Sequence, residues 1–537
     1  MFDSTASNLC SSVRIRDGDL RIQSLEDEYT TFLASLRACA KRKDLSWGNQ
    51  LHIKVIKRGL LGKCSNALVT MYAKCGQLGI AYQMLHINNC MDVFAWTDVI
   101  TAFNQKQLSH DALTCYEQMQ HRGIDPDGTA FACAMNACCN IRAVDKGEKI
   151  YSKIYQSGLL ACDIVLGTSV VDMFVKCGAL KKAQQVHEDL PQRNVVSWTS
   201  LMTGYAQRKY AVQTFKCFQQ MLLEGLSPNA MTFVCILKVC GISESLSKGE
   251  DVHNMIVQQE LLNKDIVLST AIVDMYSKCG AFAKAYKVLR QLPVKNIPSW
   301  NALISGYVQQ GLEKQALSSL ELMQLEGLCP NEVTFLCILK ACGNLGAVKQ
   351  GEYVHDEIVR QGFLSNNILL GNALVHMYSK CGALEKAQQV LMELCVRDIA
   401  SWNSLILGYA KNGQAGKALS CLEQMGGIGL SLDDVTSLCI LKACSTTGMI
   451  KNAGRHILNL KTKHDAMPNA KHFTCIMDAL GRAGYLDSAS KCILDIQDFK
   501  FSEVLYASLL SACAKWGEMD IGWWACEFGN FLPYRKG

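Results

Sequence analysis

The sequence predicts an all-α protein in which short helical hairpins stack into one solenoid. Three observations predict this fold. Residues recur at a fixed spacing, apolar residues within each repeat follow helical periodicity, and proline falls almost wholly at repeat boundaries. Because two short helices cannot bury their apolar faces alone, neighbouring hairpins must stack to build a continuous core. About fourteen such hairpins would fill residues 29–500.

The longest period is 102 residues. Two columns keep this spacing: the tryptophans Trp96, Trp198, Trp300 and Trp402, and the Lys-Cys-Gly tripeptides that begin at Lys74, Lys176, Lys278 and Lys380. Each period contains a long segment, a 36-residue segment and a 31-residue segment, all similar to one another. Counted from the first helical residue, their fifth positions ("position five") include Leu336, Asn372 and Asn403. The sequence therefore predicts three hairpins per period.

Each segment contains two amphipathic stretches. In the segment from Ile399, the first stretch has apolar residues at i, i+3, i+4 and i+7: Trp402, Leu405, Ile406 and Tyr409. Gly413 interrupts it, and the second stretch follows with Ala418, Leu419, Leu422 and Met425. Pro298 lies inside a segment, where it suits a first helical turn. Each segment is therefore expected to form one helix–turn–helix.

Composition limits the function classes. The chain has 537 residues, of which 49% are apolar and 19% charged, so a large core can form. A net charge of +6 is small for this length and argues against a densely cationic surface. The 27 cysteines contain no CxxC pair, which excludes common zinc ribbons and thioredoxin-type motifs. Buried free thiols in a reducing compartment are the simplest interpretation.

Two segment types carry a family resemblance. The stretches VVSWTSLMTGYAQ from Val195 and NEVTFLCILKAC from Asn331 resemble pentatricopeptide repeats of plant organellar proteins, whereas the tetratricopeptide pattern is absent. The order of segment lengths resembles the P-L-S arrangement of that family. The resemblance implies a right-handed superhelix that binds single-stranded RNA, with one repeat contacting one base.

In that family, position five and the last residue of a repeat together contact one base edge. The 31-residue repeats pair Thr97 with Asp127, Thr199 with Asn229, Asn301 with Asn331, and Asn403 with Asp433. The 36-residue repeats pair Asn66 with Asp92, Thr168 with Asn194, Thr270 with Asn296, and Asn372 with Asp398. All these side chains can donate or accept hydrogen bonds. The last-position column could instead cap the next helix, since Asn and Asp are favoured N-caps.

The family's base code turns these pairs into a target. Thr with Asp resembles a guanine reader, Thr with Asn an adenine reader, Asn with Asp a uracil reader, and Asn with Asn a pyrimidine reader. The short repeats then imply G-x-x-A-x-x-(C/U)-x-x-U, read 5′ to 3′ from the N-terminus. The long repeats have apolar residues at position five, which make no such hydrogen bond and are expected to space or stack: Leu33, Ala132, Val234, Leu336 and Leu438.

A basic column follows position five by two turns. Its members are Lys74, Lys176, Lys278, Lys380 and the equivalent Arg482. We expect them to contact phosphates, which would make binding depend on salt. The alternative is a solvated cation at the end of a helix, favoured by the helix dipole.

Catalytic motifs are not expected. His355-Asp356-Glu357 matches the H-x-E of cytidine deaminases in letters only, because it shares its column with His253 and Tyr151 and no CxxC follows. Residues 501–537 resemble the start of the family's E extension, which implies a truncated protein or a deaminase of the DYW type acting in trans. The interpretation is a non-enzyme without a cofactor or a metal.

Three functions remain open from the sequence. The first is a site-recognition factor for C-to-U editing of an organellar transcript, the second is an RNA stability, splicing or translation factor, and the third is a protein-binding scaffold. The P-L-S order and the E-like tail favour the first. Residues 1–28 have the serines and arginines of a faint targeting peptide. An organelle is expected, the mitochondrion slightly ahead of the chloroplast, and no membrane or small-molecule partner.

Overall fold

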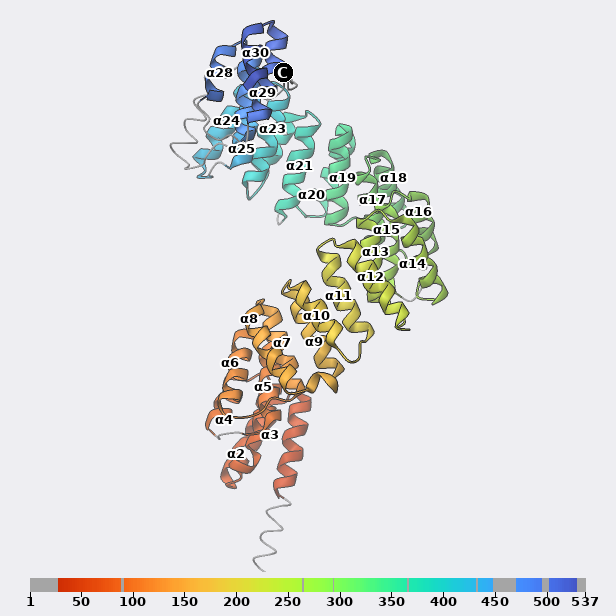
Figure 1. Cartoon of the computed structure of the whole chain (residues 1–537), viewed down its shortest axis with the longest axis vertical. Coiled ribbons are helices and arrows are strands. Elements are labelled where there is room, and N and C mark those ends of the chain that lie inside the picture. The colour runs from red at the N-terminus through yellow and green to blue at the C-terminus, as the bar shows by residue number, and fades with distance from the viewer. Residues whose placement is uncertain are drawn as a thin grey trace, which may run out of the picture. The chain divides into compact units, whose positions relative to one another are not determined.

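The computed structural model describes residues 28–87, 91–262, 265–292, 294–364, 367–430, 433–447, 470–494 and 502–528. These residues form helices joined by turns, and none of them forms a strand. Contacts between residues divide the chain into two compact units, Met1–Leu268 and Ser269–Gly537. Each unit is a stack of antiparallel helical hairpins (Figure 1).

In the first unit, each hairpin consists of a first helix and a second helix. The first helices are residues 28–42, α3 (Leu61–Lys74), α5 (Val93–Gln105), α7 (Gly128–Ile141), α9 (Ile164–Lys176), α11 (Val195–Gln207) and α13 (Ala230–Ile242). The second helices are α2 (Leu45–Lys57), α4 (Leu78–Ile87), α6 (Ser109–His121), α8 (Val144–Gln156), α10 (Leu180–Asp189), α12 (Ala211–Leu223) and α14 (Leu246–Gln258). A 3-10 turn, η1 (Leu159–Ala161), follows α8.

The second unit repeats this arrangement. Helix α15 (Ile266–Lys278) spans the division between the units. The further first helices are α17 (Ile297–Gln309), α19 (Glu332–Leu345), α21 (Ile368–Lys380), α23 (Ile399–Lys411), α25 (Asp434–Thr447), α27 (Ala470–Arg482) and α29 (Ser502–Trp516). The second helices are α16 (Phe282–Gln291), α18 (Glu313–Leu325), α20 (Val348–Arg360), α22 (Leu384–Glu393), α24 (Ala415–Gly427), α28 (Leu486–Leu494) and α30 (Met519–Phe528).

The core runs between neighbouring hairpins, as the apolar periodicity predicts. From α3 to α13 and again from α17 to α29, each first helix packs on the first helix of the next repeat. Trp96, Trp300 and Trp402 are among the largest fully buried side chains, and Trp198 is also buried. The predicted all-α hairpin solenoid is confirmed, and proline at Pro298 lies in the first turn of α17 as expected.

The Lys-Cys-Gly motif ends the first helix of the 36-residue repeats. In α21, Lys380 is the last helical residue, Cys381 is the C-cap, and Gly382 takes a left-handed φ of 78°. Glycine adopts this conformation without steric cost, so the chain can turn into the second helix. The Cys381 thiol points back to the carbonyl of Cys342 in the preceding repeat, 3.5 Å away. The motif is therefore a structural corner.

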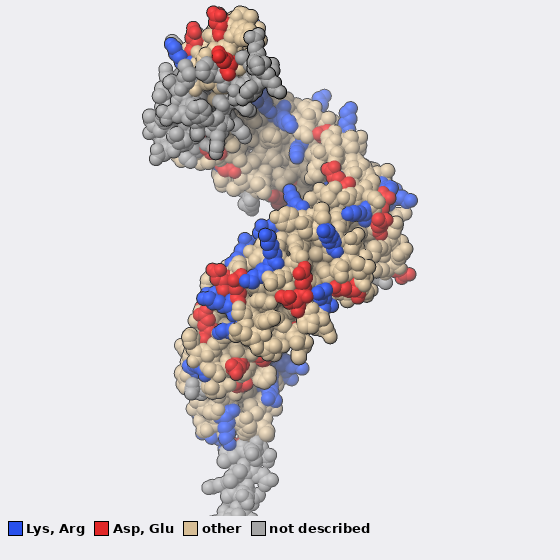
Figure 2. Space-filling view, viewed as in Figure 1, with Lys and Arg blue, Asp and Glu red and all other residues tan. Residues whose placement is uncertain are grey.

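Membrane-spanning length and surface charge are two further features of the described helices. None of these helices is long and apolar enough to cross a bilayer. On the face of the first unit seen in Figure 2, lysines and arginines are interspersed with aspartates and glutamates.

Burial raises the pKa of Cys138 and of Cys115 to about 12, so these thiols remain protonated at neutral pH.

Candidate nucleic-acid interface

The last residue of each pair is the N-cap of the next first helix. Asn194 Oδ1 accepts the backbone N–H of Ser197 at 2.7 Å, and Asp398 Oδ1 accepts that of Ser401 at 2.9 Å. The same capping geometry occurs at Asp92, Asp127, Asn229, Asn296 and Asn331. Capping of the next helix, one of the two interpretations, is therefore a role of this column. It occupies one side-chain oxygen and leaves the second polar atom of the group for another partner.

In four repeats the last residue is also hydrogen-bonded to position five, and at Asn331 and Asp433 the capping oxygen itself accepts this bond. Asn372 Nδ2 donates to Asp398 Oδ2 at 2.9 Å, and Asn403 Nδ2 donates to Asp433 at 3.2 Å. The other two direct contacts join Asn301 with Asn331 at 3.0 Å and Asn194 with Thr168 at 3.4 Å. The two predicted columns therefore meet, because a helix start lies beside the first turn of the preceding first helix.

Two further pairs are joined through a neighbouring hydroxyl. The Thr199 hydroxyl lies 2.8 Å from that of Thr232, which donates to Asn229 Oδ1 at 2.9 Å. The Thr270 hydroxyl lies 2.9 Å from that of Ser299, whose N–H is capped by Asn296. In both cases the residue three after the N-cap bridges the two columns, Thr232 through its hydroxyl and Ser299 through its hydroxyl and its backbone N–H.

The two N-terminal pairs look different. The Thr97 hydroxyl donates to the carbonyl of Val93 at 2.8 Å, as the hydroxyls of Thr168 and Thr199 do to the carbonyls four residues before them. What differs is that Asp127 caps Ala130 and no hydrogen bond joins it with Thr97. In the first pair, Asn66 accepts a hydrogen bond from Ser65, and Asp92 caps Phe94. Sequence reasoning treats all eight pairs alike, whereas the structure distinguishes pairs joined directly, pairs joined through a third residue, and the pair of Thr97 and Asp127, which no hydrogen bond joins.

The asparagine pairs are held in a fixed orientation. The Thr436 hydroxyl donates to Asn403 Oδ1 at 2.6 Å, which directs the Asn403 amide nitrogen toward Asp433. Asn403 is only 8% exposed. Burial would raise the pKa of Asp433, but hydrogen bonds from the Thr436 hydroxyl and N–H and from Asn403 outweigh it and lower that pKa. Asp433 is therefore a carboxylate at neutral pH, an acceptor beside an amide donor.

A pocket of about 390 Å³ adjoins the Thr168 and Asn194 pair. Val165 and Val196, on α9 and α11, also line it and are 71% and 55% exposed. The pocket thus has two apolar walls and a polar floor, which suits a flat ring with hydrogen-bonding groups on its edge. Such a ring would lie between consecutive first helices.

Sequence reasoning missed the apolar walls, which recur at the second position of the repeats. These side chains are all more than half exposed: Phe94, Val165, Val196, Met231, Val267, Val333, Leu369 and Val435. The signal was present in the sequence, because a recurring apolar residue stands outside the stripe that the core needs. Exposed apolar residues in a regular column indicate a binding surface.

The basic column lies where predicted, at the C-terminal ends of first helices, but it is largely ion-paired. Lys176 pairs with Asp172 at 2.8 Å and Lys278 with Asp274 at 2.6 Å, each four residues earlier. The further pairs are Lys74 with Asp98 at 3.4 Å and Arg482 with Asp478 at 3.0 Å. Lys380 instead donates to the amide oxygen of Asn344. Such exposed pairs are weak, so a phosphate could displace the carboxylate.

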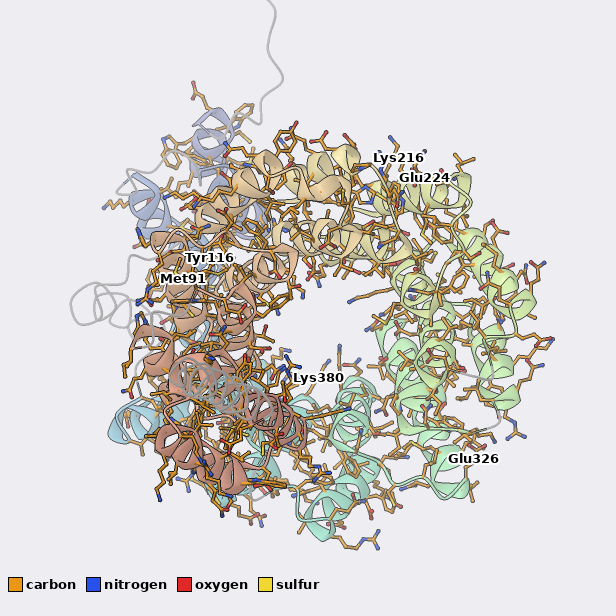
Figure 3. All side chains as sticks on the ribbon, turned by 90° about the horizontal axis from the view of Figure 1, so that it is seen from below. Met91, Tyr116, Lys216, Glu224, Glu326 and Lys380 are labelled. Atoms are coloured by element: carbon orange, nitrogen blue, oxygen red, sulfur yellow. The ribbon has the colours of Figure 1, made fainter. Side chains whose placement is uncertain are left out.

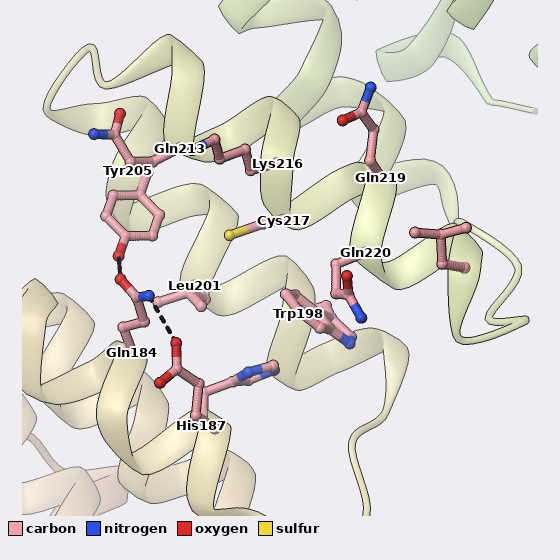
Figure 4. A pocket seen from close by; sticks show the side chains of 12 residues that line it. Gln184, His187, Trp198, Leu201, Tyr205, Gln213, Lys216, Cys217, Gln219 and Gln220 are labelled. Carbon is pink, nitrogen blue, oxygen red and sulfur yellow. Dashed lines mark hydrogen bonds between the residues drawn. The ribbon is translucent and has the colours of Figure 1, made fainter.

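A second hollow of about 380 Å³ lies on the second-helix side, between α10, α11 and α12. Tyr205 and Gln184 are hydrogen-bonded across it (Figure 4). Burial, followed by the charge of Arg193, lowers the pKa of His187 to about 4, so this histidine is neutral. Trp198 fills one side of the hollow, and its ring lies 4.2 Å from that of His187.

The H-x-E letters form no metal site. His355 Nδ1 lies 3.2 Å from the Tyr378 hydroxyl, and the Glu357 carboxylate is bonded to Arg360 and Gln361. Hydrogen bonds from Gln361 and Arg360 lower the pKa of Glu357 despite its burial. Within the described ranges, no three His, Cys, Asp or Glu side chains come together as metal ligands.

The fold and this interface define an α-solenoid of helical-hairpin repeats with a polar pair at repeat junctions. The profile described as PPR repeat family matches residues 193–241 and 295–344. The profile described as PPR repeat matches residues 94–124, 372–399, 400–430 and 471–501. The pentatricopeptide repeat-containing protein At2g13600 of Arabidopsis thaliana is 32% identical over 92% of this chain and 81% of its own length. The chain belongs to the pentatricopeptide repeat family.

Other relatives and one solved structure agree with this assignment. The Arabidopsis thaliana pentatricopeptide repeat-containing protein At4g18520, chloroplastic, is 31% identical over 77% of this chain and 67% of its own length. The Arabidopsis thaliana protein At2g03380, mitochondrial, is 28% identical over 91% of this chain and 71% of its own length. The crystal structure of the pentatricopeptide repeat protein PPR10 in complex with an 18-nt psaJ RNA element superposes with a TM-score of 0.60. The two chains are 16% identical, and the superposition covers 94% of this chain and 79% of the PPR10 chain. This likeness supports the fold.

Proposed function

We propose that this protein binds single-stranded RNA in a sequence-specific manner, with one base at each polar pair. The observation that carries the proposal is the meeting of position five with the last residue, as between Asn372 Nδ2 and Asp398 Oδ2 at 2.9 Å. One pair beside one pocket offers a donor and an acceptor to one base edge. The similar fold of PPR10, whose structure contains an RNA element, is consistent with this proposal.

Binding would exchange contacts within the protein for contacts with the base. A uracil presents a donor and acceptors on its Watson–Crick edge, which match the Asp433 carboxylate and the Asn403 amide. Because these groups are already hydrogen-bonded to one another and to Thr436, they are oriented before RNA arrives. The apolar second-position side chains, such as Val165 and Val196, would contact the two faces of the base.

The proposed target of the 31-residue repeats is G-x-x-A-x-x-(C/U)-x-x-U. The first base would be read by Thr97 and Asp127 and the last by Asn403 and Asp433. Asparagine pairs with direct hydrogen bonds should discriminate more sharply than Thr97, whose hydroxyl is turned to the carbonyl of Val93. The long repeats, with Leu336 and its equivalents at position five, would act as spacers.

At the finer level, we propose a recognition factor for C-to-U editing, with a deaminase of the DYW type supplied in trans. The P-L-S order of the segment lengths and the E-like character of residues 501–537 support this proposal, with residues 1–28 as a targeting segment and 29–500 as the RNA-binding array. The protein itself would not be an enzyme. An RNA stability, splicing or translation role is the alternative, and a protein-binding scaffold is the third candidate.

We propose an organellar location, with the mitochondrion ahead of the chloroplast. The printed names of two relatives support an organelle, since one is mitochondrial and the other chloroplastic. Sequencing organelle transcripts from a loss-of-function line would test location and role together. Loss of conversion at one or two cytidines supports editing, whereas unchanged editing with altered splicing or transcript ends supports the alternative.

Base specificity can be tested directly with purified protein. Replacing the four predicted bases in a short RNA should weaken binding by more than about tenfold. The substitution Thr97→Asn should shift the preference at the first base from guanine to uracil, because it creates the pair present at Asn403. A matched control, Leu336→Ala, should leave every base preference unchanged. Equal affinity for the original and the replaced RNA would refute base reading.

A further inference from the structure

The second unit carries four lysines on successive first helices. They define the lysine track, which consists of Lys340 on α19, Lys380 on α21, Lys411 on α23 and Lys442 on α25. Within the part of the chain that the structure describes, none of them has a carboxylate within ion-pairing distance. Figure 3 places Lys380 on the side of the first helices, opposite Glu326 on the side of the second helices.

The four lysines lie on helices that pack in succession, α19 on α21, α21 on α23 and α23 on α25. Lys380 reaches back to α19. Its Cδ lies 3.6 Å from the point where a Cβ would stand if residue 343 were not glycine. Burial lowers the pKa of His376 on α21, and the charges of Lys380 and Lys411 lower it further. Lys411 therefore acts on α21 from its place on α23.

The track continues to α25. Burial raises the pKa of Cys439 to about 11, while the charges of Lys442 and Lys411 act in the opposite direction. Burial likewise raises the pKa of Cys475 on α27, and Lys442 again opposes it. These shared effects agree with the packing of α21 on α23, of α23 on α25 and of α25 on α27. Because α19, α21, α23 and α25 pack in succession, the four lysines lie on four neighbouring helices.

Charge compensation distinguishes this row from the equivalent positions in other repeats. Four residues before the last helical lysine or arginine, α9, α15 and α27 have an aspartate that forms an ion pair: Asp172, Asp274 and Asp478. Helix α21 has His376 at that position. In the first unit, the equivalents of Lys340 are Arg37, the neutral Asn136 and Lys238, and those of Lys411 are the neutral Gln105 and Gln207. Among the described first helices, four consecutive ones that each carry an unpaired lysine occur from α19 to α25 in the second unit.

We propose that the lysine track is the principal phosphate-binding segment of the interface and holds the RNA backbone over the second unit. This inference rests on the proposed function. Lys380 and Lys411 each follow a position-five asparagine, Asn372 and Asn403, by eight residues, about 12 Å along the same helix. A backbone passing the bases at these asparagines would run beside the track. An unpaired lysine gains more from a phosphate than one that must first leave an aspartate.

The salt dependence of RNA binding tests the proposal. The variant Lys340→Ala/Lys411→Ala/Lys442→Ala removes three phosphate contacts, and for single strands each contact contributes about 0.7 to the slope of log K against log salt. The slope should fall by about 2, so that raising salt from about 50 to about 200 mM weakens the variant about 20-fold less than the wild type. The change should be equal on the target RNA and on RNA with the four bases replaced.

Two further variants make the test specific to charge compensation. Lys278→Ala, which removes an ion-paired lysine of the same column, should change the slope much less than Lys380→Ala does. His376→Asp places a carboxylate four residues before Lys380, as Asp274 stands before Lys278, and should lower the slope by about 0.7. Circular dichroism would confirm that helix content is unchanged in each exposed-site variant.

The outcomes separate this inference from the proposed function. If the wild type binds the original and the replaced RNA equally, base reading fails, whatever the slopes are. If it discriminates between them but the triple variant keeps the wild-type slope, the lysine track is refuted alone. An equal loss in Lys278→Ala and Lys380→Ala would also refute it, because ion pairing would then make no difference.

Discussion

The repeat around Trp300 and the repeat around Trp402 bury the same ring in different polar surroundings. Trp300 Nε1 donates to Glu326 Oε2 at 3.1 Å, and Glu326 also pairs with Lys295 and Arg290. In the second repeat, Trp402 is 1% exposed, and its Nε1 has no hydrogen-bond partner. The reason is one residue, since the equivalent of Glu326 is Ile428, which is 52% exposed.

The first unit repeats the arrangement of Trp300 at one tryptophan and shows a third arrangement at the other. Trp198 Nε1 donates to Glu224 at 2.9 Å, and Arg193 pairs with the same carboxylate at 2.7 Å. Beside Trp96, the residue equivalent to Glu326 is Arg122, whose guanidinium lies 5.5 Å from the centroid of the Trp96 ring. The tryptophan is thus common to all four repeats, while its polar neighbour varies. The ring serves packing, and the surface residue determines whether its N–H is satisfied.

The largest effects should come from removing the N–H while keeping an aromatic ring. Trp300→Phe and Trp402→Phe lose similar buried volume, which costs about 1–3 kcal/mol each. Trp300→Phe also loses a hydrogen bond to a charged group, whereas Trp402→Phe removes an unpaired donor. We therefore expect Trp300→Phe to destabilise its hairpin by about 1–2 kcal/mol more than Trp402→Phe does.

Hydrogen exchange read out by mass spectrometry would measure this difference hairpin by hairpin. Local opening is the appropriate quantity, because long repeat arrays do not unfold in one step. Exchange in α17 and α18 should accelerate more in Trp300→Phe than exchange in α23 and α24 does in Trp402→Phe. Equal acceleration would show that the bond to Glu326 contributes nothing measurable.

The next largest difference between the repeats should appear in their stability at acidic pH. His187 packs on Trp198, whereas the equivalent residues beside Trp300 and Trp402 are Leu289 and Leu391. Burial first, and then Arg193, lowers the pKa of His187 from 6.5 to about 4, against the opposing charges of Glu224 and Glu188. Below pH 6.5 the unfolded hairpin therefore binds a proton that the folded hairpin does not bind. Stability falls as the pH drops from 6.5 toward 4.

At pH 5 this proton linkage amounts to about 2 kcal/mol. Hydrogen exchange compared between pH 7 and pH 5, after correction for intrinsic rates, should show selective loosening of α10 and α11. The variant His187→Leu, which copies the leucine of the other repeats, should abolish this selective loosening. If α10 and α11 loosen equally in the wild type and in His187→Leu, the histidine is not the cause.

The sequence was sufficient for the fold because a repeat multiplies weak signals. One amphipathic stretch is ambiguous, but tryptophans 102 residues apart and four Lys-Cys-Gly corners point to one arrangement. The pairing of Asn372 with Asp398 was also predictable, since the spacing places a helix start beside the preceding first helix. The hydroxyl bridges at Thr232 and Ser299 were not foreseen, because they depend on side-chain rotamers.

Charge compensation was the main feature that sequence reasoning missed. The basic column was predicted as a set of equal cations, yet Lys176 and Lys278 have aspartates one turn earlier and Lys380 has none. The pattern is visible as an i, i+4 relation once the helix is known. The missing acceptor at Ile428 is harder to foresee, because it requires knowing which second-helix residue lies over the ring of Trp402.

The smallest expected effect is a gain. Ile428→Glu would place a carboxylate beside Trp402 Nε1 and near Arg397, which now donates to the carbonyl of Met392 at 2.6 Å. Because Ile428 is half exposed, little apolar burial is lost, and satisfying the buried donor should stabilise the hairpin by about 1 kcal/mol. Slower exchange in α23 and α24 would register this gain.

Two controls divide the gain into its parts. Ile428→Gln can accept the indole hydrogen bond but carries no charge, so its difference from Ile428→Glu measures the contribution of Arg397. In the Trp402→Phe background no N–H remains, and Ile428→Glu should retain only that charge contribution, as a double-mutant cycle would show. A full gain in that background would mean that the indole was not the group being satisfied. The repeats around Trp300 and Trp402 would then differ in surface charge alone.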